Sequence, residues 1–493
     1  MSFPHRLSKR TLSSISIFLI LGVPACATTL VTPANPQVSV PTAIISLPES
    51  TAAPLPTASA TPPEQASAIT RTKYHLSVFL DYQTRRLDVE QTIQYLNQTG
   101  ENLTELLLVV EPHRYADVFQ LDALTWGSGE YVGLYSLEDG ILIIPLSEPL
   151  LPNEVIKLFI TYTLHIPFQA SAFGYTARQI NLADWYPYLP PYLAGEGWRF
   201  NPPAIVGEHL IYDIADFEVI IRSPEPGLIL AAPAPAQPMA TGSFYQLEAA
   251  RSFIWSASLQ YQTLEMTVDD TLLTAYVFPE HLSAGESALK TMAAALPLFE
   301  SLYGPYPRAS LTLIEADFYD GYESDGAFFL DEVYFWDYFR SPNNYLTTLT
   351  AHETAHQWWY AQVGNDPALE PWLDEALSIY SEYLFYENIY PDQTGWWWQF
   401  RVLRMNPVGY INSNIYGFTD VDTYVNTVYL RGASFLRDLR ALIGDDAFFA
   451  FLRDYLSGGY HRQMTSADFF AVLAAHTDAD LSLLLTVYFA EDG

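Results

Sequence analysis

Cysteine, basic residues and nucleotide-binding motifs are scarce or missing in this sequence. One cysteine among 493 residues cannot form a disulfide within the chain or a zinc site of paired thiolates, so histidine and carboxylate side chains must hold any metal. Lys and Arg number 23 against 56 Asp and Glu, and the net charge of −33 excludes a general nucleic-acid binder, which needs surplus positive charge to neutralise phosphates. The sequence contains no glycine-rich phosphate loop, no GxSxG nucleophile motif and no internal repeat.

Apolar residues, in contrast, are plentiful. Hydrophobic residues make up 49% of the chain and aromatic residues 15%, which is enough to build sizeable packed cores. The length predicts two or three domains. Histidine is limited to ten residues, so a histidine pair at metal-binding spacing is informative.

Residues 1–26 have the order of a secretion signal. Basic residues between positions 5 and 10 precede an apolar run from Leu12 to Val23, which is too short for a membrane-spanning helix. The run ends at Val23-Pro24-Ala25-Cys26, which resembles the lipobox of bacterial lipoproteins, in which the cysteine is acylated. An ordinary cleaved signal with an incidental Cys26 is the alternative, and either interpretation takes the protein out of the cytoplasm.

Residues 27–70 form a linker rich in Thr, Pro, Ala and Ser, with few charges and almost no aromatic residues. Such a composition cannot bury enough apolar surface to fold, so we expect a disordered segment. Its proline content favours an extended chain, which would hold a folded body away from a membrane surface.

Two folded segments follow, and together they predict an α+β multidomain protein. Residues 71–261 contain short alternating apolar runs, typical of an antiparallel β-sandwich, at residues 74–80, 106–110, 141–146 and 155–164. A Pro-, Tyr- and Gly-rich stretch at 187–203 predicts a long covering loop. Residues 262–493 show helical periodicity, at residues 283–303, 345–363, 373–390, 429–443 and 466–476.

The motif His352-Glu353-Thr354-Ala355-His356 predicts a metal site. Histidines four residues apart lie on one face of a helix, so both imidazoles can reach one cation while Glu353 projects toward its open position. Eighteen residues after His356, Glu375 lies at the start of the next helical run, within Trp-Leu-Asp-Glu-Ala-Leu-Ser. Two imidazoles and this carboxylate would leave one position for water, whose pKa zinc lowers to about 7.

This pattern resembles the aminopeptidase N and leukotriene hydrolase family of gluzincin zinc metallopeptidases, here in a shorter lipoprotein form. The resemblance extends from about residue 74 to residue 493 and includes Tyr303-Gly304-Pro305-Tyr306-Pro307. It implies a thermolysin-like, mainly α-helical catalytic domain at 262–493. It also implies that His352, His356 and Glu375 hold one Zn²⁺, and that Glu353 is the general base that takes a proton from the attacking water and passes it to the leaving amine.

The resemblance further implies two substrate contacts. Gly321-Tyr322-Glu323-Ser324 lies where the family has a Gly-x-Met-Glu-Asn strand, so Gly321 and Glu323 are expected to bind substrate, with Glu323 pairing with its free α-ammonium. Tyr429, in Tyr-Leu-Arg-Gly-Ala, resembles a family tyrosine whose hydroxyl stabilises the oxyanion. The alternatives are an exposed acidic residue for Glu323 and a core aromatic for Tyr429.

Glu382 lies seven residues after Glu375, hence on the same helical face. We predict that it accepts a hydrogen bond from a ligand imidazole, and the alternative is a solvated surface residue.

The sequence also departs from the family pattern. Gln179-Ile180-Asn181 stands where relatives have a Gln-x-Glu segment whose Glu also contacts the amine, so one expected amine contact remains of two. The chain ends soon after Tyr429, and we expect a more open cleft that admits longer peptides.

Taken together, the sequence predicts a secreted, membrane-anchored zinc aminopeptidase that acts on peptides with a free N-terminus. Its expected location is extracytoplasmic, on the cell surface or facing the periplasm, with a lipid anchor at Cys26 and no nucleic-acid partner. Two alternatives stay open: a zinc endopeptidase or other amide or epoxide hydrolase of the same fold, and a catalytically inactive peptide-binding protein of the cell surface.

Overall fold

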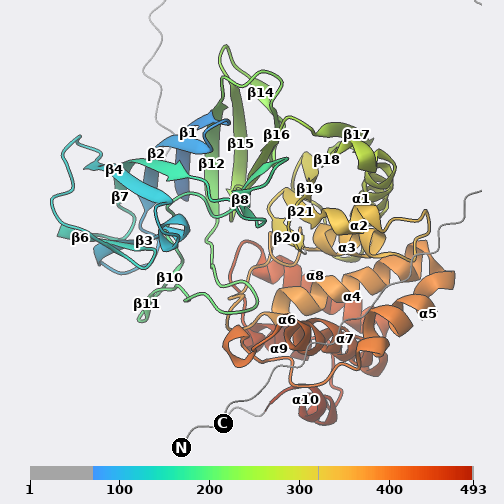
Figure 1. Ribbon diagram of the computed structural model, residues 1–493. Helices are drawn as coiled ribbons and strands as arrows, with labels where there is room; N and C mark the ends of the chain where they lie inside the picture. The colour runs from blue at the N-terminus through green and yellow to red at the C-terminus, as the bar shows by residue number, and fades with distance from the viewer. Residues whose placement is uncertain (1–69, 320, 491–493) are drawn as a thin grey trace, which may run out of the picture. The chain divides into compact units, whose positions relative to one another are not determined.

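The computed structural model describes residues 70–319 and 321–490, which lie within the unit Ser67–Gly493 (Figure 1). The predicted secretion signal at 1–26, Cys26 with its predicted acylation, and the linker up to residue 69 lie outside the described residues.

A seven-stranded sheet dominates the first half of this unit. Its strand order is β14-β15-β12-β1-β2-β7-β4. In that order the strands are Gln237–Pro238, Ser243–Ala250, Ala215–Arg222, Thr72–Asp81, Arg86–Leu96, Val155–His165 and Phe119–Trp126. Neighbouring strands are antiparallel except β1 and β12, which run parallel. In β1 every second residue, from Tyr74 to Leu80, is buried, so one face of the sheet covers the core.

Two smaller sheets cover that face and complete the predicted sandwich. The first has the order β3-β6-β5, and the second the order β13-β16-β9-β8. Their strands are Leu103–Val109, Ile141–Leu150 and Ser136–Glu138, then Ile229–Ala231, Trp255–Ser258, Ile180–Leu182 and Phe173–Tyr175. Leu106, Ile144 and Trp255 share one hydrophobic core with the large sheet. The predicted loop at 187–203 contains only a short hairpin, β10 (Tyr192–Leu193) and β11 (Gly197–Trp198).

A five-stranded sheet opens the second half, and the sequence patterns did not predict it. Its order is β17-β18-β19-β21-β20. The strands are Gln262–Val268, Thr271–Val277, Ser310–Ala316, Ala327–Asp331 and Gly321–Ser324. Helix α1 (Leu282–Leu302) packs on it, because Leu273, Ala288 and Met292 belong to one core. Strand β20 lies at the sheet edge, and helix α3 contacts it. The domain boundary at 261/262 stays a prediction.

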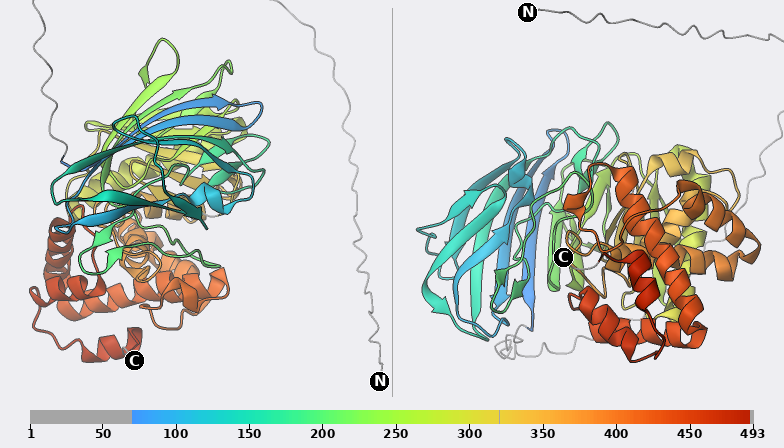
Figure 2. Two further views of the ribbon diagram at one scale, coloured as in Figure 1. Left: turned by 90° about the vertical axis from the view of Figure 1, so that its left-hand side faces the viewer. Right: turned by 90° about the horizontal axis from the view of Figure 1, so that it is seen from below.

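Helices make up the rest of this half, coloured orange to red in Figure 2 beside the blue-to-green strands. The longer ones are α3 (Tyr345–Ala355), α4 (Trp372–Ile389), α7 (Arg431–Ile443), α8 (Asp445–Gly459), α9 (Ser466–Ala474) and α10 (Ser482–Tyr488). Short helices are α2 (Glu332–Trp336), α5 (Thr394–Trp396) and α6 (Val421–Val425), and π-helical turns span Trp397–Val402 and Asn426–Leu430. None of the helices within 70–319 and 321–490 is both long and apolar enough to cross a membrane.

Helix α3 ends earlier than predicted. The pattern at 345–363 predicted one helix, but α3 stops at Ala355. Its last turn tightens, since the amide of Trp358 donates to the carbonyl oxygen of Ala355 at 2.9 Å. After the end of the helix, the His356 ring contacts the carbonyl oxygen of Trp359 at 2.9 Å.

Candidate active site

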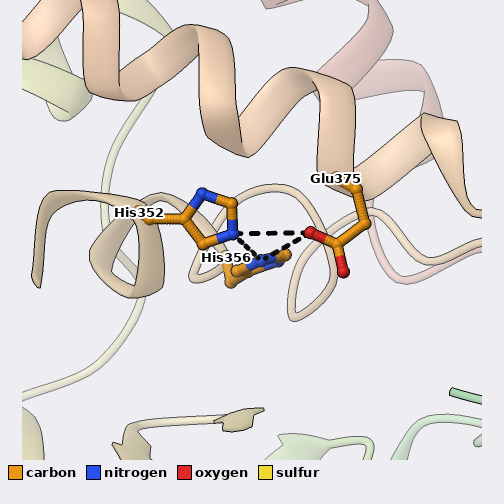
Figure 3. A group of neighbouring side chains, drawn as sticks. All are labelled: His352, His356 and Glu375. Atoms are coloured by element: carbon orange, nitrogen blue, oxygen red, sulfur yellow. Dashed lines mark hydrogen bonds and ion pairs between the residues drawn. The ribbon is translucent and has the colours of Figure 1, made fainter. Parts of the chain in front are cut away.

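The structure brings together His352 of α3, His356 directly after the last residue of α3, and Glu375 of α4. The Nε2 atoms of His352 and His356 lie 3.1 Å apart, and Glu375 Oε2 lies 3.4 Å and 3.6 Å from them (Figure 3). All three side chains are buried. Figure 3 shows them converging from α3 and α4 on one point.

This triangle fits a tetrahedral metal site. Zinc bonds of about 2.0–2.2 Å to nitrogen and oxygen require ligand atoms about 3.3–3.5 Å apart, close to the observed separations. Glu375 Oε2 forms no hydrogen bond with any described residue although it is buried, so a cation is the natural partner that would satisfy it. Two imidazoles and one carboxylate are also the donor set of catalytic zinc sites.

Each histidine is oriented by its other ring nitrogen. His352 Nδ1 lies 3.0 Å from Glu382 Oε1. Glu382 is fully buried and also accepts hydrogen bonds from Arg401 and from the indole of Trp397. Burial opposes its ionisation, but the charge of Arg401 and the His352 contact hold the pKa of Glu382 below its usual value. His356 Nδ1 contacts the Trp359 carbonyl oxygen and the Ser378 hydroxyl, so both Nε2 atoms are left for a metal.

Glu353 lies beside the metal triangle in a tight site. It is 5% exposed, and its Oε2 atom has no hydrogen-bond partner in the described part of the chain. Burial raises the pKa of Glu353 to about 8. The backbone of Gly321 in β20 lies close to this carboxylate. A Cβ at position 321 would lie only 2.2 Å from Glu353 Oε1. A side chain at 321 would therefore displace the Glu353 carboxyl group.

Glu323 of β20 faces the same space. One carboxylate oxygen of Glu323, one of Glu353 and one ring nitrogen of His356 all lie within 4.8 Å of one another. Glu323 is 7% exposed, so it is not the exposed loop residue of the alternative interpretation. Burial raises its pKa. Glu323 thus places a second carboxylate beside Glu353, next to the metal triangle.

Tyr429 approaches the triangle from the π-helical turn Asn426–Leu430. Its hydroxyl donates a hydrogen bond to Glu375 Oε1, and its ring stacks on the His352 ring with centroids 6.1 Å apart at 11°. Single π-helical turns within helices are frequently found at functional sites. The hydroxyl therefore lies beside a predicted metal ligand.

The structure adds acidic residues that the sequence patterns did not single out. Asp374 is buried beside Glu375 and accepts the Glu375 amide at 2.7 Å. Asp184 accepts hydrogen bonds from the hydroxyl of Tyr322, the residue between Gly321 and Glu323, at 2.9 Å to each oxygen. Burial, and after it the charges of Glu323 and Glu375, raise the pKa of Glu208 in the segment before β12. Asp184 and Glu208 carry no motif, and only the fold brings them here.

Comparison with known proteins finds relatives for the C-terminal half of the chain. Residues 286–488 match the Peptidase family M1 domain. "Aminopeptidase M1-B" of Oryza sativa subsp. japonica is 26% identical over 243 residues, covering 46% of this chain and 28% of that protein. "Aminopeptidase N" of Lactobacillus helveticus is 27% identical over 252 residues, covering 46% of this chain and 29% of that protein. The matched region thus spans less than a third of either relative.

A solved structure shows the same fold over most of the chain. The crystal structure of an M1 zinc metallopeptidase from Deinococcus radiodurans superposes with a TM-score of 0.61 at 18% identity, covering 85% of this chain and 93% of that one.

Proposed function

We propose that this chain, which carries an M1-family zinc peptidase domain, is an aminopeptidase that removes residues from the N-termini of peptides. The observation that carries the proposal is the position of Glu323, whose carboxylate lies within 4.8 Å of Glu353 and His356. A buried carboxylate at this distance from the metal ligands can pair with a substrate ammonium while the adjacent peptide bond reaches the metal site.

Three expectations from the sequence are confirmed at the level of family and fold. The matches confirm an aminopeptidase N-like gluzincin family and a mixed α+β multidomain fold. They also confirm a metallopeptidase site for one catalytic zinc ion. Because the match covers less than a third of the plant and bacterial aminopeptidases named above, the substrates of this chain are part of the proposal.

The chemistry assigned to this chain uses groups already in position. Bound zinc would polarise the scissile carbonyl and make water acidic enough to lose a proton near neutral pH. Glu353 accepts that proton on its carboxylate and delivers it to the nitrogen of the leaving amine. The Tyr429 hydroxyl, which donates to Glu375 in this structure, would turn its hydrogen bond to the carbonyl oxygen as negative charge develops there. Glu382 and Ser378 keep the two imidazoles in the required orientation.

Free and blocked peptides test this function. We would load the purified protein with zinc and compare the hydrolysis of free-amine peptides with that of their N-acetylated twins, with Glu353→Gln as the inactive control. Cleavage of the free peptides alone supports the aminopeptidase proposal. Equal cleavage of both sets would favour an endopeptidase or another hydrolase of this fold. Zinc binding without turnover of either set would favour a peptide-binding protein.

Secretion and membrane attachment form a separate part of the proposal, supported by sequence alone. The apolar segment before Cys26 and the proline-rich linker after it favour a lipid-anchored protein that works outside the cytoplasm. Replacing Cys26 with Ser should move the protein from the membrane fraction to the soluble fraction of cells that express it. A wild-type protein that is soluble, or a Cys26→Ser variant that stays with membranes, would contradict the anchor.

A further inference from the structure

Arg251, the residue directly after β15 of the sandwich, joins three distant parts of the chain. Its side chain is buried, with 3% of its surface exposed. The guanidinium donates hydrogen bonds to three backbone carbonyl oxygens, those of Tyr360 at 2.6 Å, Tyr212 at 3.1 Å and Arg462 at 3.1 Å. These carbonyl groups lie after α3, before β12 and after α8. One arginine of the sandwich therefore holds the backbone of two segments in the catalytic half.

Tyr360 is the contact that leads to the metal site. It lies four residues after His356, and its φ of +145° is unfavourable for a residue with a side chain. Such a conformation persists only where surrounding contacts enforce it, and the bond from Arg251 is one of them. The peptide group that joins Trp359 to Tyr360 supplies the carbonyl oxygen that lies 2.9 Å from His356 Nδ1. The contact with Arg251 therefore helps to fix the acceptor that orients the His356 ring.

Ser252, the next residue, makes a second connection between the same parts. Its hydroxyl lies 2.9 Å from the hydroxyl of Ser324, the last residue of β20, and 3.4 Å from that of Tyr360. The amide of Arg251 donates to Asp325 Oδ2 at 2.8 Å. The end of β15 thus contacts both the strand that carries Glu323 and the segment after α3.

Gly364 leaves the space that the guanidinium fills. A Cβ at position 364 would lie 2.5 Å from Arg251 Cζ and 2.7 Å from each Nη atom. The backbone cannot easily move away, because the Gly364 amide donates to the Arg462 carbonyl oxygen at 3.0 Å. A side chain at 364 would therefore push the guanidinium off its carbonyl partners while leaving its charge in the protein.

We propose that Arg251 is a positioning residue for the metal site, which fixes the turn at Trp359–Tyr360 and with it the imidazole of His356. A guanidinium is planar and has five N–H donors, so one side chain can hold three carbonyl groups in a fixed arrangement. Groups that orient a ligating histidine influence metal affinity. The sandwich thus contributes to zinc binding by the catalytic half through a residue that is not itself a ligand. This inference rests on the zinc site of the proposed function.

Two different changes at the same contact test this role. Arg251→Lys keeps the charge, but a single ammonium cannot bond to three carbonyl groups as the planar guanidinium does. Gly364→Ala keeps the arginine and displaces it. Arg453→Lys and Gly458→Ala are the matched controls, because Arg453 is exposed and donates to the Leu302 carbonyl oxygen, and a Cβ at 458 would meet no atom within 4 Å.

The measurements do not depend on turnover. Competition with a chelator gives the zinc affinity of each protein, and replacement of zinc by cobalt(II) gives a visible absorption spectrum that depends on ligand geometry. Chemical denaturation shows which variants are folded and how far their stability falls. Peptide hydrolysis is followed separately.

We expect Arg251→Lys and Gly364→Ala each to weaken zinc binding roughly threefold to tenfold, at or below the lower end of the effect of residues that contact a ligand directly. Both should shift the cobalt absorption, since His356 is held less firmly. The double variant should resemble the single variants and not multiply their effects, because both changes remove the same contacts. The two control variants should match wild type.

Wild-type zinc affinity and cobalt absorption in Gly364→Ala would overturn the inference, even if that variant unfolds more easily, because Arg251 would then only support the fold. Losses that multiply in the double variant, or an equal loss in Arg453→Lys, would overturn it as well. If Arg251→Lys does not fold, Gly364→Ala alone decides. If wild type binds zinc but cleaves no peptide, the proposed function fails, while the zinc and cobalt measurements still decide the role of Arg251.

Discussion

Glu382 Oε1 lies 3.0 Å from His352 Nδ1, on the side of the imidazole opposite the predicted metal. The same carboxylate accepts hydrogen bonds from Arg401 Nε and Nη2, each at 3.0 Å, and from Trp397 Nε1 at 3.0 Å. A buried carboxylate held by three donor groups cannot rotate freely, so the ring of His352 is fixed before any metal arrives. The orientation of His352 therefore depends on Trp397 and Arg401, which lie in the π-helical turn Trp397–Val402.

Glu382→Gln should weaken zinc binding about 10–100-fold, because an amide is a poorer acceptor for the imidazole N–H and lacks the negative charge that pairs with Arg401. Competition with a chelator of known affinity measures this directly. Activity should return when free zinc is raised. Glu387→Gln on the same helix is the control, since Glu387 pairs with Arg440 near the surface. Unchanged zinc affinity in Glu382→Gln would contradict the role given to this residue.

Gly321→Ala should reduce kcat about tenfold or more with little change in zinc content. The new methyl group would overlap Glu353 Oε1, and displacing a proton-transferring carboxylate by about 1 Å can cost a factor of about 100. Steady-state kinetics and metal analysis separate the two effects. Gly458→Ala is the matched control, because no atom lies within 4 Å of a Cβ at that position in α8. A fully active Gly321→Ala enzyme would show that Glu353 does not need its present position.

The fold was predictable where apolar residues alternate. The run at 74–80 predicted a strand, and β1 spans Thr72–Asp81. In contrast, β21 is a short apolar run that is buried along its whole length, and such a run can be a strand or a buried helix. Strand β21 could not be predicted for this reason, whereas the alternation in β17 is a signal that could have predicted a strand. The end of α3 was missed because residues 356–363 continue the helical pattern, whereas the helix stops at Ala355.

The site was predictable where its residues are close in sequence. His352, Glu353 and His356 lie within one helical turn, and Glu375 follows at a fixed spacing, so local geometry specifies them. Glu208 and Asp184 come from loops more than 100 residues earlier and reach the site only because the sandwich packs on the catalytic half. Periodicity and motif spacing contain no information about such contacts.

Tyr429→Phe should lower kcat by a factor of about 100–1,000 and leave KM and zinc content close to wild type. The hydroxyl is expected to act on the carbonyl oxygen only as charge develops there, so its loss affects the transition state more than substrate binding. Peptide hydrolysis with zinc analysis gives all three quantities. Tyr410→Phe, at an exposed tyrosine, should behave as wild type. A rise in KM as large as the fall in kcat, or a loss of zinc, would instead show that Tyr429 supports Glu375.

Asp184→Asn should change how stability depends on pH. Burial raises the pKa of Asp184 to about 6, against hydrogen bonds from Tyr212 and Tyr322 that favour its charged form. A raised pKa in the folded state means that the stabilisation from protonated Asp184 is complete below about pH 4 and is lost as pH rises through about 6. The asparagine side chain of the variant cannot ionise, so its contribution does not change with pH. Between pH 4 and pH 7 wild type should lose stability relative to the variant, on the order of 3 kcal/mol.

Chemical denaturation of both proteins at pH 4, 5, 6 and 7 measures this difference. Asp420→Asn provides a control without a pH effect in this range, because hydrogen bonds from Thr423 lower the pKa of exposed Asp420 below 3.8. Its contribution is lost only as pH falls through that lowered value, so the stability curves of Asp420→Asn and wild type should run parallel from pH 4 to pH 7. Stability curves of wild type and Asp184→Asn that run parallel from pH 4 to pH 7 would show that Asp184 stays ionised in the fold. In that event the Tyr322 hydroxyl, on the strand that also carries Glu323, donates to a charged carboxylate throughout this pH range. If wild type loses stability relative to the variant over this range as predicted, Tyr322 donates to a carboxyl group that is partly neutral near pH 6.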